Sequence, residues 1–297
     1  MTICGFRATG KREKDHSTLK PVFAPCYKIS HSEASGGLDR CPLYIRYGSH
    51  TDRGKVRTTN EDSYTANAKS QLFLVADGMG GHAAGEIASA IAASTVEECV
   101  ALQRGTGMDT AEALRRAVEE ANSRIYETQL GRMDLSGMGS TLTALVFSRD
   151  LYHVAHVGDS RAYLLRRGEL RQLTRDHSLV WQLYENGLLE KKDLTSHPQK
   201  NLITRSVGPH AQVEVDMASG TLACGDIFML CSDGLTDVVP EERILAILSD
   251  GPKAPQQLSE ELVEAANQAG APDNVTAVVV RLESDRASQD DTSRMLQ

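Results

Sequence analysis

Short apolar runs alternate along this chain with longer segments in which apolar residues recur at helical spacing. The runs 71–76 and 227–231 have the length and composition of buried strands. In 85–103 and 109–130, apolar residues recur three or four positions apart, which predicts two amphipathic helices. The same reasoning predicts further strands over 43–47, 141–147, 151–157, 161–166, 171–173, 213–217 and 275–282, and further helices over 241–248 and 256–269. Because the strands are grouped and the helices come in pairs, the pattern favours α+β layers over alternating βαβ winding.

The two ends of the chain lack this periodicity. Residues 1–42 mix Lys, Arg, Ser, Thr and Gly without an apolar stripe, and we expect a disordered N-terminal extension there; a small packed subdomain is the alternative. A globular domain is expected over 43–284 and a disordered polar tail over 285–297. Within the domain, residues 178–212 predict a short helix and an irregular lid beside the functional site.

Composition narrows the class of partner. The 297 residues carry a formal net charge of −8, which argues against nucleic acid as the main partner. No apolar run approaches the ~18 residues of a membrane span, so no membrane association is expected. The six cysteines form no CxxC pair, and Cys99, Cys224 and Cys231 lie among apolar residues. We therefore predict buried free thiols and a cytoplasmic location.

The most informative polar residues are carboxylates at the ends of apolar runs. Asp77 and Asp233 come at the ends of two predicted strands, and Asp273 precedes a third. Carboxylates that converge repel one another unless cations offset their charge. Oxygen ligands alone favour Mg²⁺ or Mn²⁺ over Zn²⁺. The pattern predicts a multi-metal site of the kind that hydrolyses phosphate esters, although an Asp-Gly turn at Asp77 or an Asx turn at Asp273 would give the same local sequence.

Eight short motifs in a fixed order carry a resemblance to a known family. They are TDRGKVRTTNED from Thr51, VADGMGGHAAGE from Val75, GSTL from Gly139, HVGDSRAYLLRRGEL from His156, LTRDHSLV from Leu173, LITRSVG from Leu202, LCSDGLTDVV from Leu230 and PDNVTAVVV from Pro272. Together they resemble the metal-dependent Ser/Thr protein phosphatases of type 2C, the PPM family, in its bacterial branch. The resemblance covers about residues 45–282. It implies a four-layer α-β-β-α sandwich with a central pair of antiparallel β-sheets.

The resemblance also implies roles for individual residues. Asp77 would bridge two metal ions and the Gly78 carbonyl would ligate one of them, with Asp233 and Asp273 completing the ligand set. Arg57 would bind the substrate phosphate; a solvent-exposed arginine in a basic stretch is the alternative. The remaining assignments are Glu61 and Asp62 as acceptors for water molecules around the metals, Asn274 as a support of the site through its amide, and Asp159 and Asp237 as holders of a third, weaker ion.

Two positions leave alternatives open. Asp159 could instead pair with Arg161, two residues later. Met79 stands where animal members of the family carry a histidine that can act as general acid. His82, three residues after Met79, is then either a general acid or a packing or helix-capping residue.

The implied activity is that of a protein phosphatase that removes phosphate from Ser and Thr by direct attack of a metal-activated water, with two Mn²⁺ or Mg²⁺ sites and a third. Its partners would be phosphorylated Ser/Thr proteins and a eukaryotic-like Ser/Thr kinase, and it would act as a monomer. One rival function is a pseudophosphatase that binds phosphoproteins without turnover, against which the retained Asp77, Asp233 and Asp273 argue. Another is a phosphatase of the same fold inside another signalling module, such as an anti-sigma-antagonist phosphatase.

Overall fold

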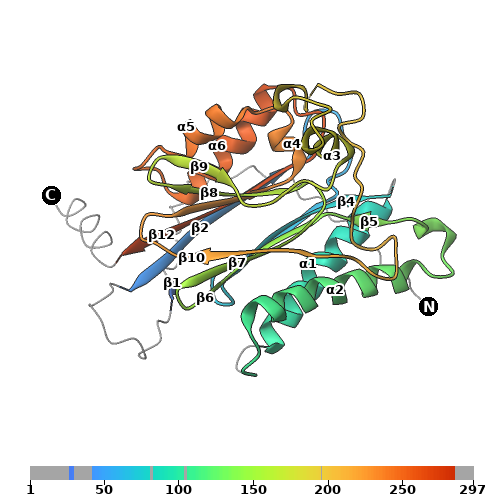
Figure 1. Cartoon of the computed structure of the whole chain (residues 1–297), viewed down its shortest axis with the longest axis horizontal. Helices are drawn as coiled ribbons and strands as arrows, with labels where there is room; N and C mark the ends of the chain where they lie inside the picture. The colour runs from blue at the N-terminus through green and yellow to red at the C-terminus, as the bar shows by residue number, and fades with distance from the viewer. Residues whose placement is uncertain (1–26, 30–41, 81–82, 104–105, 195, 285–297) are drawn as a thin grey trace, which may run out of the picture.

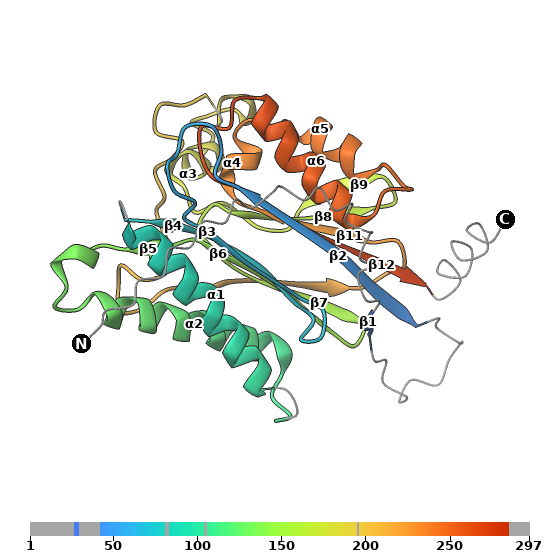
Figure 2. The same cartoon turned by 180° about the vertical axis from the view of Figure 1, so that it is seen from behind.

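Two antiparallel β-sheets lie face to face, and a pair of helices covers the outer face of each sheet (Figure 1 and Figure 2). The computed structural model describes residues 27–29, 42–80, 83–103, 106–194 and 196–284. This arrangement confirms the predicted four-layer α-β-β-α sandwich.

The first sheet has the strand order β1-β2-β12-β11-β8-β9. Its strands are β1 (Tyr27–Lys28), β2 (Leu43–Asp52), β12 (Val275–Ser284), β11 (Ile227–Cys231), β8 (Arg161–Arg166) and β9 (Glu169–Gln172). The helices α5 (Glu241–Leu248) and α6 (Pro255–Gln268) cover its outer face (Figure 1).

The second sheet has the order β10-β7-β6-β4-β3, with β5 paired to β4. Its strands are β10 (Asp216–Thr221), β7 (Leu151–Val157), β6 (Leu142–Ser148), β4 (Leu72–Met79), β3 (Asp62–Asn67) and β5 (Gly139–Ser140). The helices α1 (Ala83–Gln103) and α2 (Thr110–Gln129) cover its outer face (Figure 2). The short elements η1 (Met133–Leu135), α3 (Leu179–Glu185), η2 (Lys191–Asp193) and α4 (Asp233–Thr236) lie in the connections.

Side-chain alternation in β4 shows why these layers form. Leu72 and Leu74 are fully buried in the core that β4 shares with α1 and α2. Phe73 and Val75 are fully buried in a different core, which also contains Phe228 of β11. Successive side chains of a strand point to opposite faces. A strand covered on both faces therefore needs the uninterrupted apolar run that predicted it.

The strand β3 was missed by the sequence prediction. Its residues, DSYTAN, are mostly polar, and only Thr65 among them is buried. An edge strand that pairs on one side needs no apolar run, so periodicity gives little signal. The strand predicted over 213–217 begins later, as β10 (Asp216–Thr221). Val213 and Val215 pack against the core formed with α1 and α2 but do not join the sheet.

The N-terminal prediction is wrong for residues 27–29. Tyr27 and Lys28 pair with Ile45 and Tyr44 of β2, and Ile29 is fully buried in the core between the sheets. A segment this short shows no periodicity, so its single buried isoleucine could not be recognised from the sequence. The rest of 1–42 and the predicted tail 285–297 lie outside the described residues.

One end of the sandwich collects the loops that carry the acidic motifs. The C-terminal end of β4, the N-terminal end of β12, α4 and the start of α1 meet there, beside α3 (Figure 1). Residues 178–212, called the flap below, contain α3 and η2 and are otherwise irregular, as predicted. Cys99 is half-buried and Cys231 buried, both as free thiols, but Cys224 is exposed, so that part of the cysteine prediction is wrong. Among the described residues, no helix is both long and apolar enough to span a bilayer.

Candidate active site

Three aspartates from different strand ends line one cavity of about 270 Å³. Asp77 comes from the end of β4, Asp233 from the first residue of α4, and Asp273 from the loop before β12. Arg57 lies at the same cavity. The other lining residues are Glu61, Gly78, Met79, Gly80, Asn201, Ile203 and Asn274. The structure therefore brings together Arg57, Asp77, Asp233 and Asp273, the four residues that were predicted to be catalytic.

The backbone of Asp77 is held on both sides. Its N–H donates to the Thr141 hydroxyl at 2.9 Å, and the Thr141 N–H donates to the Asp77 carbonyl at 2.8 Å. A Cβ atom on Gly78 would lie 2.1 Å from the carbonyl oxygen of Gly85, because α1 begins directly against this strand end. Only glycine allows that approach. The strand end and the helix start are thus packed backbone to backbone at the site.

The Asp233 turn lies directly against the loop that carries Asp273. A Cβ atom on Gly234 would lie 2.0 Å from the carbonyl oxygen of Asn274. The Asn274 side chain then reaches the loop that carries Arg57: its Nδ2 donates to the Arg53 and Thr59 carbonyls at 3.0 and 2.8 Å, and its Oδ1 accepts from the Glu61 N–H at 2.9 Å. Asn274 therefore holds the Arg57 loop beside Asp273.

Asp62 carries a buried carboxylate oxygen and joins the two sheets. It lies opposite Asp77 in the β3–β4 register. Its Oδ2 accepts from the Ser232 and Thr276 hydroxyls at 2.8 and 2.6 Å, whereas its Oδ1 has no partner among the described residues. Burial raises the pKa of Asp62 to about 6, although the two hydroxyl bonds oppose this shift.

A second, smaller cavity of about 30 Å³ adjoins the first through Asp233 and Asn201, which line both. Asp159 and Asp237 line it as well. Burial raises the pKa of Asp159 to about 7, and the charges of Asp176 and Asp237 add to the shift.

Arg161 does not neutralise Asp159 through a salt bridge. Its Nε donates to Asp176 at 3.0 and 2.9 Å and its NH2 at 2.6 Å, so the guanidinium is bound by Asp176 instead. The alternative that Asp159 pairs with Arg161 is therefore wrong. Spacing along the chain could not predict this pair, since Asp176 lies fifteen residues after Arg161.

The charges at this end of the molecule are poorly compensated. Burial, followed by the charges of neighbouring carboxylates, raises the pKa values of Asp77 and Asp233 well above the usual range. Three carboxylate oxygens are buried without a hydrogen-bond partner in the described part of the chain: the Oδ1 atoms of Asp62, Asp159 and Asp233. A buried acceptor without a donor is costly unless a cation or a proton reaches it.

Two of the other carboxylates face cationic side chains. Arg57 NH2 lies 2.7 Å from Asp273 Oδ2, and Lys200 Nζ lies 2.5 Å from Asp237 Oδ2. Over the described ranges, no three His, Cys, Asp or Glu side chains are grouped closely enough to form a ready-made metal site. A divalent ion would bind here by drawing carboxylates away from these two contacts.

Comparison with known proteins decides the family. A family model for protein phosphatase 2C matches residues 49–274. This chain belongs to the protein phosphatase 2C family. The matched range includes the loop with Arg57 and every aspartate of both cavities, and it ends at Asn274.

Bacterial members of the 2C family are similar to this chain over most of its length. The serine/threonine protein phosphatase PstP of Mycobacterium tuberculosis is 42% identical over 242 residues, which are 82% of this chain and 46% of PstP. The serine/threonine phosphatase stp of Listeria monocytogenes is 39% identical over 250 residues, which are 81% of this chain and 97% of the Listeria protein. This chain therefore spans about half the length of PstP and nearly all of the Listeria protein.

Solved structures of phosphatases match the sandwich. A crystal structure of the M. tuberculosis phosphatase has a TM-score of 0.75 at 42% identity and covers 80% of this chain and 99% of that chain. The catalytic domain of PstP in complex with two manganese ions has a TM-score of 0.74 at 39% identity and covers 82% of this chain and 100% of that chain.

The residues of this site fit divalent cations. The ligands available at the two cavities are oxygen atoms, which suit Mn²⁺ and Mg²⁺. The buried, unpartnered oxygens of Asp62, Asp159 and Asp233 are the groups that such ions would satisfy.

Several site residues had no counterpart in the sequence predictions. Lys200 and Asn201 come from the irregular flap, where no periodicity marks a functional side chain. Ser232 and Thr276 could not be recognised from the sequence, because their hydroxyls contact Asp62 only through the position of β3 in the folded structure. His82, for which the sequence leaves open both a role as general acid and a packing or capping role, lies outside the described residues.

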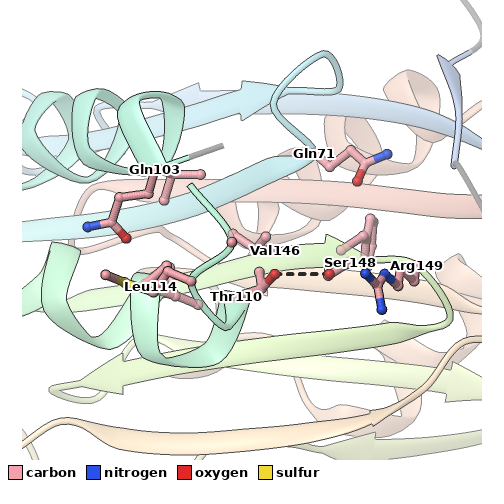
Figure 3. Close-up of a pocket in the computed structure, with 12 residues that line it drawn as sticks. Gln71, Gln103, Thr110, Leu114, Val146, Ser148 and Arg149 are labelled. Carbon is pink, nitrogen blue, oxygen red and sulfur yellow. Dashed lines mark hydrogen bonds between the residues drawn. The ribbon is translucent and has the colours of Figure 1, made fainter. Parts of the chain in front are cut away.

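A larger cavity, of about 460 Å³, lies elsewhere in the molecule (Figure 3). Its floor includes Val100, Leu114 and Val146, and Thr110 donates to Ser148 across it at 2.9 Å. Gln71, on its rim, precedes Asp77 by six residues, which is about 20 Å along a strand. The larger cavity is therefore at the opposite end of the sheet from the carboxylates.

Proposed function

We propose that this chain is a metal-dependent protein Ser/Thr phosphatase that hydrolyses phosphoserine and phosphothreonine in proteins and opposes a eukaryotic-like Ser/Thr kinase. The observation that carries the proposal is a guanidinium, Arg57, at one cavity with buried carboxylates whose charge is not compensated. The names of the relatives support the same activity. The proposal includes action as a monomer in the cytoplasm, without nucleic acid or membrane partners.

Two ions, Mn²⁺ or Mg²⁺, would be held by Asp77, the Gly78 carbonyl, Asp233 and Asp273. A third would be held by Asp159 and Asp237. Bound there, divalent cations supply Lewis-acid activation of water and offset the charge of a phosphoryl group. The manganese complex of the PstP catalytic domain supports the choice of metal.

Arg57 would bind the substrate phosphate. Its side chain is 54% exposed, so the guanidinium is accessible from solvent while it contacts Asp273. A phosphate monoester presents two oxygens to the planar fork of an arginine and makes a stronger contact than one carboxylate oxygen. Arg57 would therefore move from Asp273 to the substrate, and the same movement frees Asp273.

Two sets of contacts would hold the rest of the site in place while the Arg57 side chain moves. Asn274 bonds the carbonyls on either side of Arg57 in its loop, so only the side chain has to move. The hydroxyls of Ser232 and Thr276 orient the Asp62 carboxylate. Its unpartnered Oδ1 would then be available as an acceptor at the site, and Glu61 would act beside it.

The test is hydrolysis of a phosphothreonine peptide by purified protein with Mn²⁺, with EDTA-treated protein as the control. We expect phosphate release that requires the metal and is absent in an Asp233→Asn variant. A phosphotyrosine peptide of the same sequence should be hydrolysed more slowly. If a folded, manganese-bound protein binds the phosphothreonine peptide but releases no phosphate, the chain is a pseudophosphatase and the proposed activity is wrong.

A further inference from the structure

The flap places one lysine among the carboxylates of the smaller cavity. Lys200 Nζ lies 2.5 Å from Asp237 Oδ2, and the two side chains are 28% and 23% exposed. Asp237 is fixed at the end of α4, where its N–H donates to the Asp233 carbonyl at 2.8 Å. The contact therefore joins the flap to the turn that carries Asp233.

The other charged residues of this cavity distinguish Lys200 from Arg161, the second cationic residue that lines it. Three aspartates line the cavity as proposed ion holders: Asp159, Asp233 and Asp237. Two cationic residues also line it, and one of them, Arg161, is bound by Asp176. Of the two cationic lining residues, Lys200 is thus the one whose charged group contacts a proposed ion holder, Asp237. Asp159 is only 7% exposed, and its Oδ1 has no partner in this part of the structure.

A lysine ammonium is a compact point charge on a flexible stem. It can occupy the same side of a carboxylate as a metal ion, and it can leave without a rearrangement of the backbone. A third divalent ion between Asp159 and Asp237 would bind the Asp237 carboxylate, whose Oδ2 Lys200 now contacts. Two cations this close would also repel each other.

We propose that Lys200 is a built-in cation that competes with a third divalent ion for Asp237, so that binding of the third ion releases this contact of the flap. The inference rests on the proposed function, because that function supplies the third ion. It adds that the flap sets the affinity of the third site. The coupling is reciprocal. The contact of Lys200 with Asp237 lowers the affinity for the third ion, and the bound ion destabilises that contact by the same free energy.

The chain offers a matched control for this contact. Lys191, also in the flap, pairs with Glu241 of α5 at 3.1 Å. Its side chain is 60% exposed, and it does not line either cavity of the site. Replacing Lys191 removes one flap ion pair and one positive charge, as replacing Lys200 does, but leaves the three aspartates untouched.

The test is calorimetric titration of the full, metal-free chain with Mn²⁺ alone. In the wild type we expect two tight sites and a weaker third. Lys200→Met keeps the length of the stem without its charge and should tighten the third site about tenfold, a usual size for coupling between two ligands. Lys200→Arg, which keeps a cation, should retain the weak third site, and Lys191→Met should change nothing. Adding Asp237→Asn to Lys200→Met should abolish the gain.

The sign of the change separates competition from support. The competition does not exist if Lys200→Met binds the third Mn²⁺ with the same affinity as the wild type, with lower affinity, or not at all. A result of that kind together with two tight sites and phosphopeptide hydrolysis overturns only this inference. A wild type that binds no Mn²⁺ tightly overturns the proposed function and this inference with it.

Discussion

The two ends of the sandwich differ in charge more than in shape. At the end with α3, α4 and the start of α1, aspartates line cavities of about 270 and 30 Å³, and the Oδ1 atoms of two of them, Asp159 and Asp233, are buried without a partner among the described residues. At the opposite end, the cavity of about 460 Å³ is larger, yet none of its described lining residues is acidic. The one buried, unpartnered polar atom of that lining is the neutral amide oxygen of Gln103.

This difference shows why volume is a poor guide to function here. A cavity without acidic side chains costs packing energy but offers no carboxylate to a cation, whereas buried carboxylates cost stability that a bound cation can return. We therefore expect substitutions at the carboxylate end to change activity more than stability. Substitutions at the opposite end should do the reverse.

The largest effect is expected for Asp77→Asn. The amide removes a charge and one oxygen ligand from the centre of the site, and even outer partners of metal ligands cost about 10–100-fold when lost. We expect manganese-dependent turnover of a phosphothreonine peptide to fall by more than about 100-fold, while the melting temperature of the metal-free protein stays the same or rises. Turnover within tenfold of wild type would show that Asp77 does not hold the metals.

The metal-free protein should lose stability as the pH rises. The pKa values of Asp62 and Asp159, about 6 and about 7 in the folded state, lie above the ordinary value of 3.8. The folded state therefore binds these protons more tightly than the unfolded state. Its advantage is lost between about pH 4 and pH 7, and it amounts to about 3 kcal/mol for Asp62 and about 4 kcal/mol for Asp159.

Thermal unfolding in EDTA from pH 4.5 to pH 8 measures this loss. Asp159→Asn removes one of the two groups and should flatten the profile, and Mn²⁺ at pH 8 should restore the melting temperature. If the melting temperature of the metal-free protein rises with pH to the same extent in the wild type and in Asp159→Asn, the pKa values of these carboxylates are not raised by folding.

At the opposite end, Ile29→Ala should reduce stability without changing the chemistry. Ile29 is fully buried between the sheets, and its N–H donates to the Leu43 carbonyl at 2.9 Å. Truncating a buried isoleucine costs about 2–5 kcal/mol of unfolding free energy. Urea denaturation measures this, and kcat/KM at low temperature should match the wild type. Lys28→Ala, on the exposed side of the same strand, is the control; equal effects would show that Ile29 is not packed.

Arg57→Ala should act mainly on KM. A charged contact of this kind contributes about 1.5–3 kcal/mol, so KM for the phosphopeptide should rise about 10- to 100-fold. Manganese affinity should hold or increase slightly, because Asp273 loses a competing partner. Arg53→Ala, in the same loop, is the control. Loss of manganese binding with an unchanged KM would assign Arg57 to the structure of the site.

The smallest effect is expected in the larger cavity. Ala113 lines it from α2 and is 8% exposed. Ala113→Leu should fill part of the space and raise the unfolding free energy by about 0.5–2 kcal/mol, with kcat/KM within about twofold of wild type. A loss of activity on the scale of Arg57→Ala would mean that the larger cavity is coupled to the carboxylate site and that the two ends do not act independently.

The sequence predicted the layers and the strand-end aspartates for identifiable reasons. The uninterrupted run before Asp77 required a strand buried on both faces, and a carboxylate directly after such a run has to leave the core at a site. Asp62 and Asp77 could not be placed opposite each other, because β3 is polar and gives no strand signal.

Other contacts depend on the tertiary structure alone. Ile29 is a single apolar residue in a polar stretch, and Lys200 reaches Asp237 from an irregular flap. The partner of Arg161 proved to be Asp176 rather than the nearer Asp159, a choice that only the hairpin of β8 and β9 determines. Spacing along the chain carries no information on such pairs.

Manganese anomalous scattering from crystals of the wild type soaked in MnCl₂ tests the central claim most directly. We expect two strong peaks at the larger of the two carboxylate cavities, between Asp77, Asp233 and Asp273. A third, weaker peak between Asp159 and Asp237 should strengthen in Lys200→Met crystals. Saturating manganese that leaves no peak at Asp77, Asp233 and Asp273 would contradict the assignment of these carboxylates to a metal centre.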